Sequence, residues 1–335
     1  MQSLKGGHTP GRLEALLARP RPVLLDGAVG TELARRGVDT RLPLWSARAL
    51  LDDSGLETLT AIHADYARAG AEILVTDTFR TTRRALEKAG HGASWREVNR
   101  RAVERARAGA SAATPLPGAP EGICLVAGGI APLEDCYRPD LVPPQSECLV
   151  EHHRQVDLLA GLGVDLVFVE TMNCLREAEA ALQAARDSGL DVLLSLCPRP
   201  PHHLLSGETL EEAVPRLADA GGPELRGLLV NCARPDAMQE IFPAFVRLAP
   251  GLPHGLYAHL GEPDEVTGWR LAERHEPEAY AAWMETRVEE GARLVGGCCG
   301  TTPDHIAALR HMLDRLTPSR RSGASPPPGR SRGRG

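Results

Sequence analysis

The chain has 335 residues, of which 42% are hydrophobic, and a formal net charge of −6 at pH 7. This length accommodates one large domain or two of ordinary size, and the apolar fraction is sufficient for a large buried core. Residues 317–335 contain five arginines and no acid, so residues 1–316 carry −11, and such an acidic body gives no support for binding nucleic acid.

No run of 18 apolar residues occurs, so we expect no membrane-spanning segment. The first 22 residues lack a continuous apolar stretch followed by a small-residue cleavage site, which argues against export. Eight cysteines are present, but a chain of this length does not need disulfides to fold. A reducing cytoplasm is therefore the expected location.

Eight short apolar runs recur along the chain, each followed by a segment of helical period. Continuous apolar runs favour strands that are covered on both faces, as in a parallel sheet. The predicted strands are 23–26, 72–76, 123–127, 166–170, 192–197, 228–232, 255–259 and 293–297.

The intervening segments have helical period. Between Leu56 and Ala69, apolar side chains that include Leu59 and Ile62 fall on one face, and Gly70 predicts the end of that helix. Further helices are predicted over 176–188, 210–220 and 277–290, the last with a proline in its first turn.

Eight strand–helix units predict an α/β fold, a single-domain (β/α)8 TIM barrel; a doubly wound open sheet is the alternative. The barrel is favoured because unusual polar residues and cysteines fall at the carboxyl ends of strands, where barrel active sites are built. We expect an N-terminal extension over 1–21, the barrel over 22–316 and a disordered basic tail over 317–335. The segment 132–147 should form an enlarged loop over the barrel mouth.

Three cysteines stand at the ends of two predicted strands. Cys298 and Cys299 lie between glycines, which allow the backbone to turn two neighbouring sulfurs toward one point, and Cys232 ends an earlier strand. Three thiolates would leave zinc with one open coordination position, as in catalytic sites. The alternative is that the three are small buried core residues.

Two acids follow apolar runs directly. Asp26 ends the first predicted strand and Glu170 ends the fourth. A carboxylate at a buried strand end needs a cation, a metal or backbone donors, so these acids are candidates for binding the ammonium group of an amino-acid substrate. Capping of the following helix is an equally good explanation.

The other cysteines and the paired histidines are predicted to have structural or surface roles. The cysteines are Cys124, Cys136, Cys148, Cys174 and Cys197. The pairs His152-His153 and His202-His203 lack a third partner at ligand spacing, so we expect them to be solvated or to cap helices.

The segments LLDGAVGTELARRG, AGAEILVTDTFRTT, ETMNCLREAEAAL, the strand-ending Asn231-Cys232 and GGCCGTTPDHI resemble the homocysteine S-methyltransferase family, from about Val23 to about Leu313. This resemblance implies a zinc-containing barrel in which Cys232, Cys298 and Cys299 hold the metal. It also implies that Asp26 and Glu170 bind the amino group of homocysteine.

Three features differ from the family's usual pattern: Asp77, where members often have asparagine, the loop 128–140 and the turn Ala258–Glu262. We therefore expect the acceptor chemistry to be retained and the methyl-donor side to have changed. Leu44–Ala47 resembles the S-methylmethionine-using branch, and Glu134, Asp135 and Asp140 make the loop acidic, which suits a cationic donor. Trp45, Tyr137, Tyr257 and Trp269 are candidate aromatic contacts for that cation, with ordinary packing as the alternative.

The predicted reaction is zinc-dependent transfer of a methyl group to the homocysteine thiolate, giving methionine. The expected donor is a sulfonium such as S-methylmethionine or S-adenosylmethionine. The alternatives are a methyltransferase for another small thiol or selenol, a non-catalytic zinc or redox-sensing barrel, and an aldolase-like barrel. The last alternative is weakened because no lysine is well placed for Schiff-base chemistry.

Overall fold

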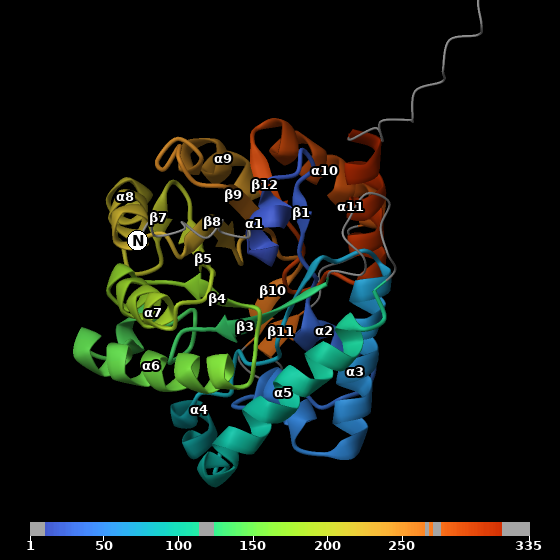
Figure 1. The fold of residues 1–335 in the computed structure, drawn as a ribbon, viewed down its shortest axis with the longest axis vertical. Helices are drawn as coiled ribbons and strands as arrows, with labels where there is room; N and C mark the ends of the chain where they lie inside the picture. The colour runs from blue at the N-terminus through green and yellow to red at the C-terminus, as the bar shows by residue number, and fades with distance from the viewer. Residues whose placement is uncertain (1–10, 114–123, 265–267, 271–275, 317–335) are drawn as a thin grey trace, which may run out of the picture.

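The computed structural model describes residues 11–113, 124–264, 268–270 and 276–316. Eight strands, all parallel to their neighbours, form one sheet in the order β1-β12-β9-β8-β5-β4-β3-β2. A parallel bridge between Leu25 and Ile73 joins its two edges. The predicted (β/α)8 barrel is therefore confirmed, and the open sheet is excluded (Figure 1).

Each predicted strand corresponds to an observed one, with boundaries that differ by a few residues; Ile123 of the third prediction lies outside the described residues. The barrel strands are β1 (Val23–Leu24), β2 (Ile73–Val75), β3 (Leu125–Ile130), β4 (Leu166–Met172), β5 (Val192–Leu196), β8 (Leu225–Asn231), β9 (His254–Tyr257) and β12 (Ala292–Val295).

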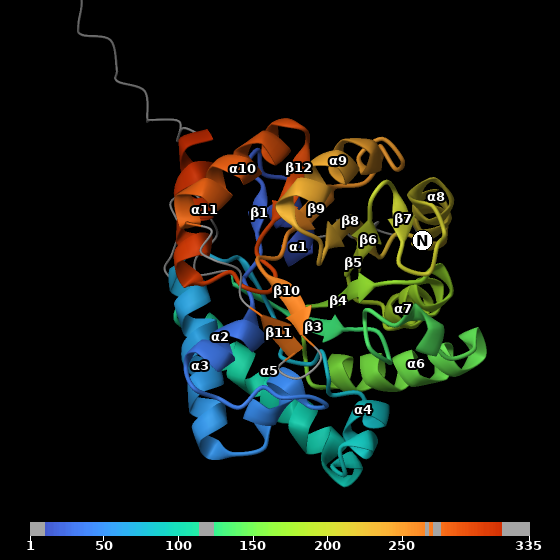
Figure 2. The same ribbon diagram turned by 180° about the vertical axis from the view of Figure 1, so that it is seen from behind.

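Helices surround the barrel on its outside, as Figures 1 and 2 show. The larger ones are α2 (Val29–Arg35), α3 (Asp53–Arg68), α5 (Trp95–Ala110), α6 (Gln145–Gly161), α7 (Leu175–Asp187), α8 (Leu210–Ala220), α9 (Pro235–Phe245), α10 (Pro277–Glu289) and α11 (Pro303–Leu316). Shorter elements are α4 (Arg83–Lys88) and the 3-10 turns η1 (Trp45–Leu50), η2 (Gly92–Ser94) and η3 (Pro139–Leu141).

Helix α3 shows how local sequence sets these boundaries. The Asp52 side chain accepts a hydrogen bond from the Gly55 amide at 2.8 Å, which caps the first turn. Leu59 and Ile62 are buried against the barrel, and the chain leaves the helix at Gly70, whose φ of +100° favours glycine. The periodicity therefore predicted both the buried face and the end of this helix.

The apolar core forms two layers. One lies between strands and helices, and the other fills the barrel interior with side chains such as Phe168, Leu193 and Leu229. Leu13 and Leu16 of α1 (Arg12–Leu17) belong to the interior cluster. The described part of the expected N-terminal extension thus packs against one end of the barrel.

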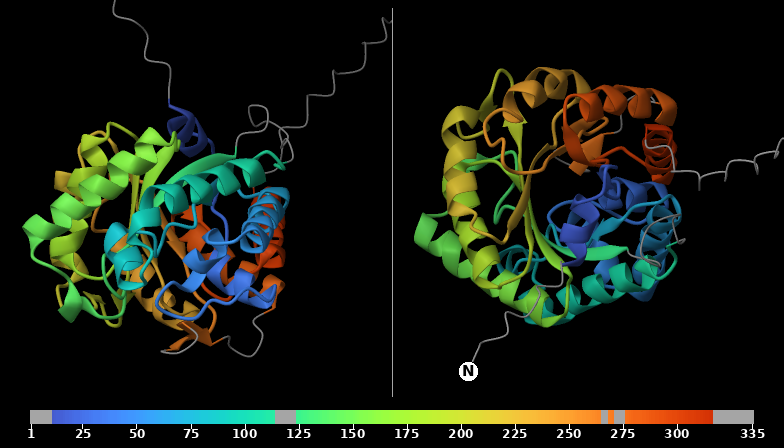
Figure 3. Two further views of the ribbon diagram at one scale, coloured as in Figure 1. Left: turned by 90° about the horizontal axis from the view of Figure 1, so that it is seen from below. Right: turned by 45° about the horizontal axis from the view of Figure 1, so that its top comes forward.

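Two short hairpins project from the barrel: β6 (Pro198–Arg199) with β7 (His203–Leu204), and β10 (Glu262–Asp264) with β11 (Gly268–Arg270). Figure 3 shows α1 and the β10–β11 hairpin at opposite ends of the molecule. Among the described residues, no helix has the length and apolarity needed to cross a membrane. The basic tail predicted over 317–335 lies outside the described residues.

Candidate active site

A cavity of about 710 Å³ opens at the carboxyl ends of the strands. Asp26, Glu170, Cys232, Cys298 and Cys299 all line it, although they come from four different strands. The structure therefore brings together every residue that the sequence suggested for the metal and for the acceptor. This position is the one at which barrel enzymes build their active sites.

The backbone around the cysteines is unusually constrained. Cys232 has a φ of +57°, a conformation that is rare for residues other than glycine. Gly300 has a φ of +88°, and a Cβ there would lie 2.0 Å from the Leu260 carbonyl oxygen. A Cβ at Gly297 would meet the Thr301 hydroxyl at 2.2 Å. Glycine on both sides of the cysteine pair is thus required for the turn that directs the sulfurs into the cavity.

The thiols converge on Cys232. Hydrogen bonds with Cys197, Cys298 and Cys299 hold the pKa of the Cys232 thiol well below its usual value, although burial opposes this shift. All eight cysteines are free. Within the described ranges, no three His, Cys, Asp or Glu side chains already have the arrangement of a metal site, and the sulfurs hydrogen-bond with one another.

Two further side chains approach Cys232 that the sequence did not single out as its partners. The Tyr137 hydroxyl lies 3.1 Å from the Cys232 sulfur, and the His259 side chain contributes to the lowered pKa of the Cys232 thiol. The turn that holds His259 was expected to belong to the donor side. The structure places it beside the cysteines.

The carboxyls of Asp26 and Glu170, which also line the cavity, have little contact with solvent. Burial raises the pKa of Asp26 to about 8. A 2.9 Å hydrogen bond from the Val75 amide favours the ionised carboxylate and so opposes this shift. Burial, reinforced by the negative charges of Asp26, Cys232 and Asp77, raises the pKa of Glu170 to about 8. A Cβ at Gly129 would lie 3.0 Å from the Glu170 carboxyl oxygen, so glycine leaves room for that side chain.

Asp77 is a third buried acid near this pair. Burial raises its pKa to about 6, opposed by a hydrogen bond from Ser46. Its Oδ2 atom has no hydrogen-bond partner among the described residues. None of the three acids is among the ion pairs found in the described part of the chain, so a bound cation would relieve an excess of buried negative charge.

The four candidate aromatic residues, Trp45, Tyr137, Tyr257 and Trp269, all line the same cavity. Trp45 stands edge-on to Phe79 with ring centroids 5.8 Å apart, and a Cβ at Gly30 would lie 2.5 Å from the Trp45 ring. Leu44–Ala47 and the loop after β3 therefore meet at the cavity, as the sequence suggested.

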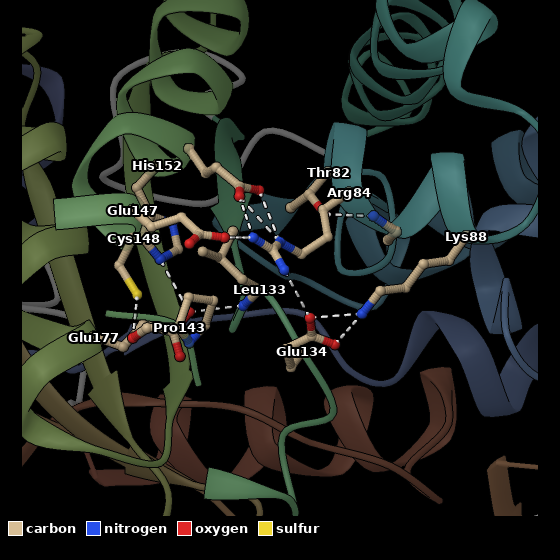
Figure 4. Close-up of polar contacts among 12 residues, drawn as sticks. Thr82, Arg84, Lys88, Leu133, Glu134, Pro143, Glu147, Cys148, His152 and Glu177 are labelled. Carbon is tan, nitrogen blue, oxygen red and sulfur yellow. Dashed lines mark hydrogen bonds and ion pairs between the residues drawn. The ribbon is translucent and has the colours of Figure 1, made fainter. Parts of the chain in front are cut away.

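The loop between β3 and α6 is fixed by long-range contacts, which Figure 4 shows. Arg84 of α4 contacts Glu134 at 3.1 Å and also pairs with Glu147 and Glu151 of α6. On the other side, the fully buried Glu177 accepts hydrogen bonds from the Leu133 amide at 2.7 Å and from His152 at 3.2 Å. These contacts hold the loop that carries Tyr137.

The interpretation of this loop as an acidic surface for a cation is not supported. Glu134 pairs with Arg84 and Lys88, Asp135 lies 3.4 Å from Arg80, and Asp140 pairs with Arg138 at 2.6 Å. Each negative charge is thus offset locally. Of the three acids, only Asp135 lines the cavity.

One expectation about the remaining histidines was wrong, and two of the remaining cysteines lie close to the site. His152 is fully buried and hydrogen-bonded to Glu177, so it is neither solvated nor a cap. The five other cysteines are buried, but Cys136 lines the cavity and Cys197 hydrogen-bonds to Cys232. The sequence placed Cys136 and Cys174 close to the predicted barrel-mouth loops, and Cys136 does line the cavity; it gave no sign that Cys197 lies beside Cys232.

Comparison with known proteins identifies the family of this chain. The sequence pattern of the homocysteine S-methyltransferase family matches residues 23–313. Homocysteine S-methyltransferase of Escherichia coli (strain K12) is 33% identical over 320 residues, which cover 89% of this chain and 97% of that protein. Selenocysteine methyltransferase of Astragalus bisulcatus is 27% identical, with coverage of 88% and 93%.

The crystal structure of the homocysteine methyltransferase MmuM from Escherichia coli, in its metallated form, is similar to this structure with a TM-score of 0.76. The two are 30% identical, and the match covers 90% of this chain and 99% of that one. Sequence and fold thus agree over nearly the whole barrel. The chain is an enzyme that belongs to the homocysteine S-methyltransferase family.

Proposed function

We propose that this enzyme transfers a methyl group to the thiolate of homocysteine, giving methionine, at a zinc ion bound by Cys232, Cys298 and Cys299. The observation that carries this proposal is that three thiols and two carboxyls, the buried Asp26 and the partly buried Glu170, line one cavity. A thiol-binding metal and an ammonium-binding acid pair are the two features that an amino-acid thiol requires.

The residues present fit zinc. Cysteine sulfurs at the usual Zn–S distance of about 2.3 Å are about 3.8 Å apart around a tetrahedral ion. In support of this fit, the three thiols line one cavity, and Cys298 and Cys299 both contribute to the lowered pKa of the Cys232 thiol. Bound zinc would leave one position for the substrate sulfur and, as a Lewis acid, would keep that sulfur deprotonated. A metallated relative supports metal binding.

Asp26 and Glu170 would hold the substrate's ammonium group. Asp26 is buried and Glu170 is partly buried, and both have raised pKa values of about 8, so a cationic partner would stabilise their ionised forms. This contact would fix one end of homocysteine while its sulfur lies toward the cysteines. The enzyme's part in the reaction is then to align the thiolate with the methyl carbon.

The donor we propose is a sulfonium such as S-methylmethionine or S-adenosylmethionine. The carbon–sulfur bond of the donor breaks with its electron pair left on the donor sulfur, while the homocysteine thiolate supplies the pair for the new bond. Trp45 and Tyr137 face this space and would stabilise the donor's positive charge. Because the thiols must remain reduced, we also propose a reducing compartment, the cytoplasm.

The test combines metal analysis with a donor panel. Purified enzyme should contain one zinc per chain and form methionine from homocysteine with S-methylmethionine or S-adenosylmethionine, but less well with betaine or methylcobalamin. Selenocysteine should be included as acceptor, since one relative is named for it. Zinc binding without any methyl transfer would favour a redox-sensing role, and transfer without metal would contradict the proposed site.

A further inference from the structure

Two arginines line the cavity, Arg80 and Arg138, and they differ in how their charges are used. Arg138 is exposed, and its guanidinium donates to both oxygens of Asp140, from Nε at 2.8 Å and from Nη2 at 2.6 Å. Such a two-point contact is the strongest arrangement that a guanidinium forms with a carboxylate. The charge of Arg138 is therefore already matched by its own loop.

Arg80 has no comparable partner. Its side chain is only 18% exposed, and its single ion pair within the described ranges is the 3.4 Å approach of Nη2 to the Asp135 carboxylate. The Nε atom is buried and has no hydrogen-bond partner among the described residues. A guanidinium that is withdrawn from water without acceptors for its N–H groups is destabilised, so an anion in the cavity would stabilise it.

The place of Arg80 is set by the segments that carry the aromatic residues of the cavity. Asp135 approaches Arg80 through Oδ2 and accepts a 2.8 Å hydrogen bond from the Tyr137 amide through Oδ1. Phe79, the neighbour of Arg80 in the chain, packs edge-on against Trp45. Since all five residues line the cavity, the guanidinium shares one region of it with the aromatic rings.

A guanidinium in this region is unfavourable for a donor that carries positive charge alone. Like charges repel, and a cavity in a protein screens them less than bulk water does. A donor that has both a sulfonium and a carboxylate removes this conflict. Aromatic faces can then stabilise the sulfonium while the guanidinium donates to the carboxylate.

We propose that Arg80 binds the carboxylate of the methyl donor, and so restricts the donor to molecules that carry both a sulfonium and a carboxylate. The inference rests on the proposed function, and it makes Arg80 a determinant of donor specificity. Homocysteine also has a carboxylate. In the proposed function its ammonium end lies at Asp26 and Glu170, whereas Arg80 lies with the aromatic residues proposed to hold the donor.

The test measures the binding of S-methylmethionine and S-adenosylmethionine to the purified enzyme by calorimetry, without homocysteine. Each is compared with its carboxyl methyl ester, which keeps the sulfonium and the ammonium group but loses the negative charge. Arg80→Gln removes the guanidinium, and Arg80→Lys keeps the positive charge without the planar fork. Arg138→Gln is the matched control, because it removes the same charge from the lining of the same cavity.

In the wild type, the sulfonium that serves as donor should bind about 10–100-fold more tightly than its ester. Arg80→Gln should lose this difference by weakening the donor and leaving the ester unchanged, and Arg80→Lys should recover part of it. Arg138→Gln should discriminate against the ester as the wild type does. In turnover, Arg80→Gln should raise the KM for the donor by the same factor and leave the KM for homocysteine unchanged.

A wild type that binds neither sulfonium, or that binds the esters as tightly as the parent molecules, would overturn the inference. Unaltered discrimination in Arg80→Gln, or an equal loss in Arg138→Gln, would do the same. A rise in the KM for homocysteine alone would also overturn it, because Arg80 would then bind the acceptor. Failure of the proposed function is distinguishable, since the wild type would discriminate against the esters but form no methionine from homocysteine.

Discussion

The cysteines and acids of the cavity lie at the ends of strands. The opposite side of the cavity is formed by loops, which are held in place by side chains from distant parts of the sequence. Asp26, Glu170 and Cys232 lie within or directly after strands of the barrel, whose register fixes their positions. Tyr137 is carried instead by a loop anchored through Arg84 and Glu177. The strand-end side should therefore tolerate little change, and the loop side should be able to vary without loss of the barrel.

The largest effect is expected on the strand-end side. Cys298→Ala should abolish turnover and reduce bound zinc to near zero, because two thiolates hold zinc far less well than three. Cys124→Ala is the control, since Cys124 is buried at the start of β3 away from the cavity lining. Zinc content and methionine formation are measured together, and full activity in Cys298→Ala would refute the metal assignment.

The acceptor acids should show a large but partial effect. Asp26→Asn and Glu170→Gln should each raise the KM for homocysteine about 10–100-fold, since a hydrogen bond to a charged group contributes about 1.5–3 kcal/mol. Zinc content should not change. As a control acceptor, a simple thiol without an amino group should show a much smaller change in KM in the same two variants. Equal losses with both thiols would make these acids structural supports.

The same acids predict how acceptor binding depends on pH. Asp26 and Glu170 have pKa values of about 8 in the free enzyme, so both are largely protonated at pH 6. An ammonium group binds the ionised forms, so binding should release protons and tighten about tenfold or more as the pH rises from 6 to 8. Calorimetry in two buffers of different ionisation enthalpy measures this release. Proton uptake on binding would contradict the assignment.

The smallest effect is expected on the loop side. Arg84→Gln should raise the KM for the donor about 3–10-fold by loosening the loop that carries Tyr137, without changing zinc content or the KM for homocysteine. Arg83→Gln is a matched control on the same helix, because Arg83 makes only an exposed pair with Glu87 at 2.6 Å. If Arg84→Gln also loses zinc, the two sides of the cavity are not independent.

The part of the molecule that could be predicted from sequence is the part governed by local pattern. Apolar runs gave the eight strands, and residues such as Asp26 and Cys232 were identified because they directly follow those runs. Parallel strands end at one face, so these residues had to come together once the barrel was recognised. The cysteine pair was conspicuous because glycines flank it.

What the sequence did not indicate depends on contacts between distant segments. The pairing of Glu134 with Arg84 spans 50 positions, so the loop's charge looked available when it was in fact neutralised. His152 resembled a solvated residue because its partner, Glu177, lies on another helix. The turn at His259 reaches the chain beside Cys232, where its amide donates to the Ala233 carbonyl at 3.1 Å, and this contact likewise follows from barrel closure rather than from any local motif.

Helix α1 bears on where small molecules can enter and leave the barrel. Leu13 and Leu16 close the end of the barrel opposite the cysteines, above an interior filled with apolar side chains. In the proposed reaction, both substrates and both products would then share the opening at the other end. The molecule bound deepest would leave last, so a demethylated donor that stayed at the loops would delay the release of the methionine beneath it.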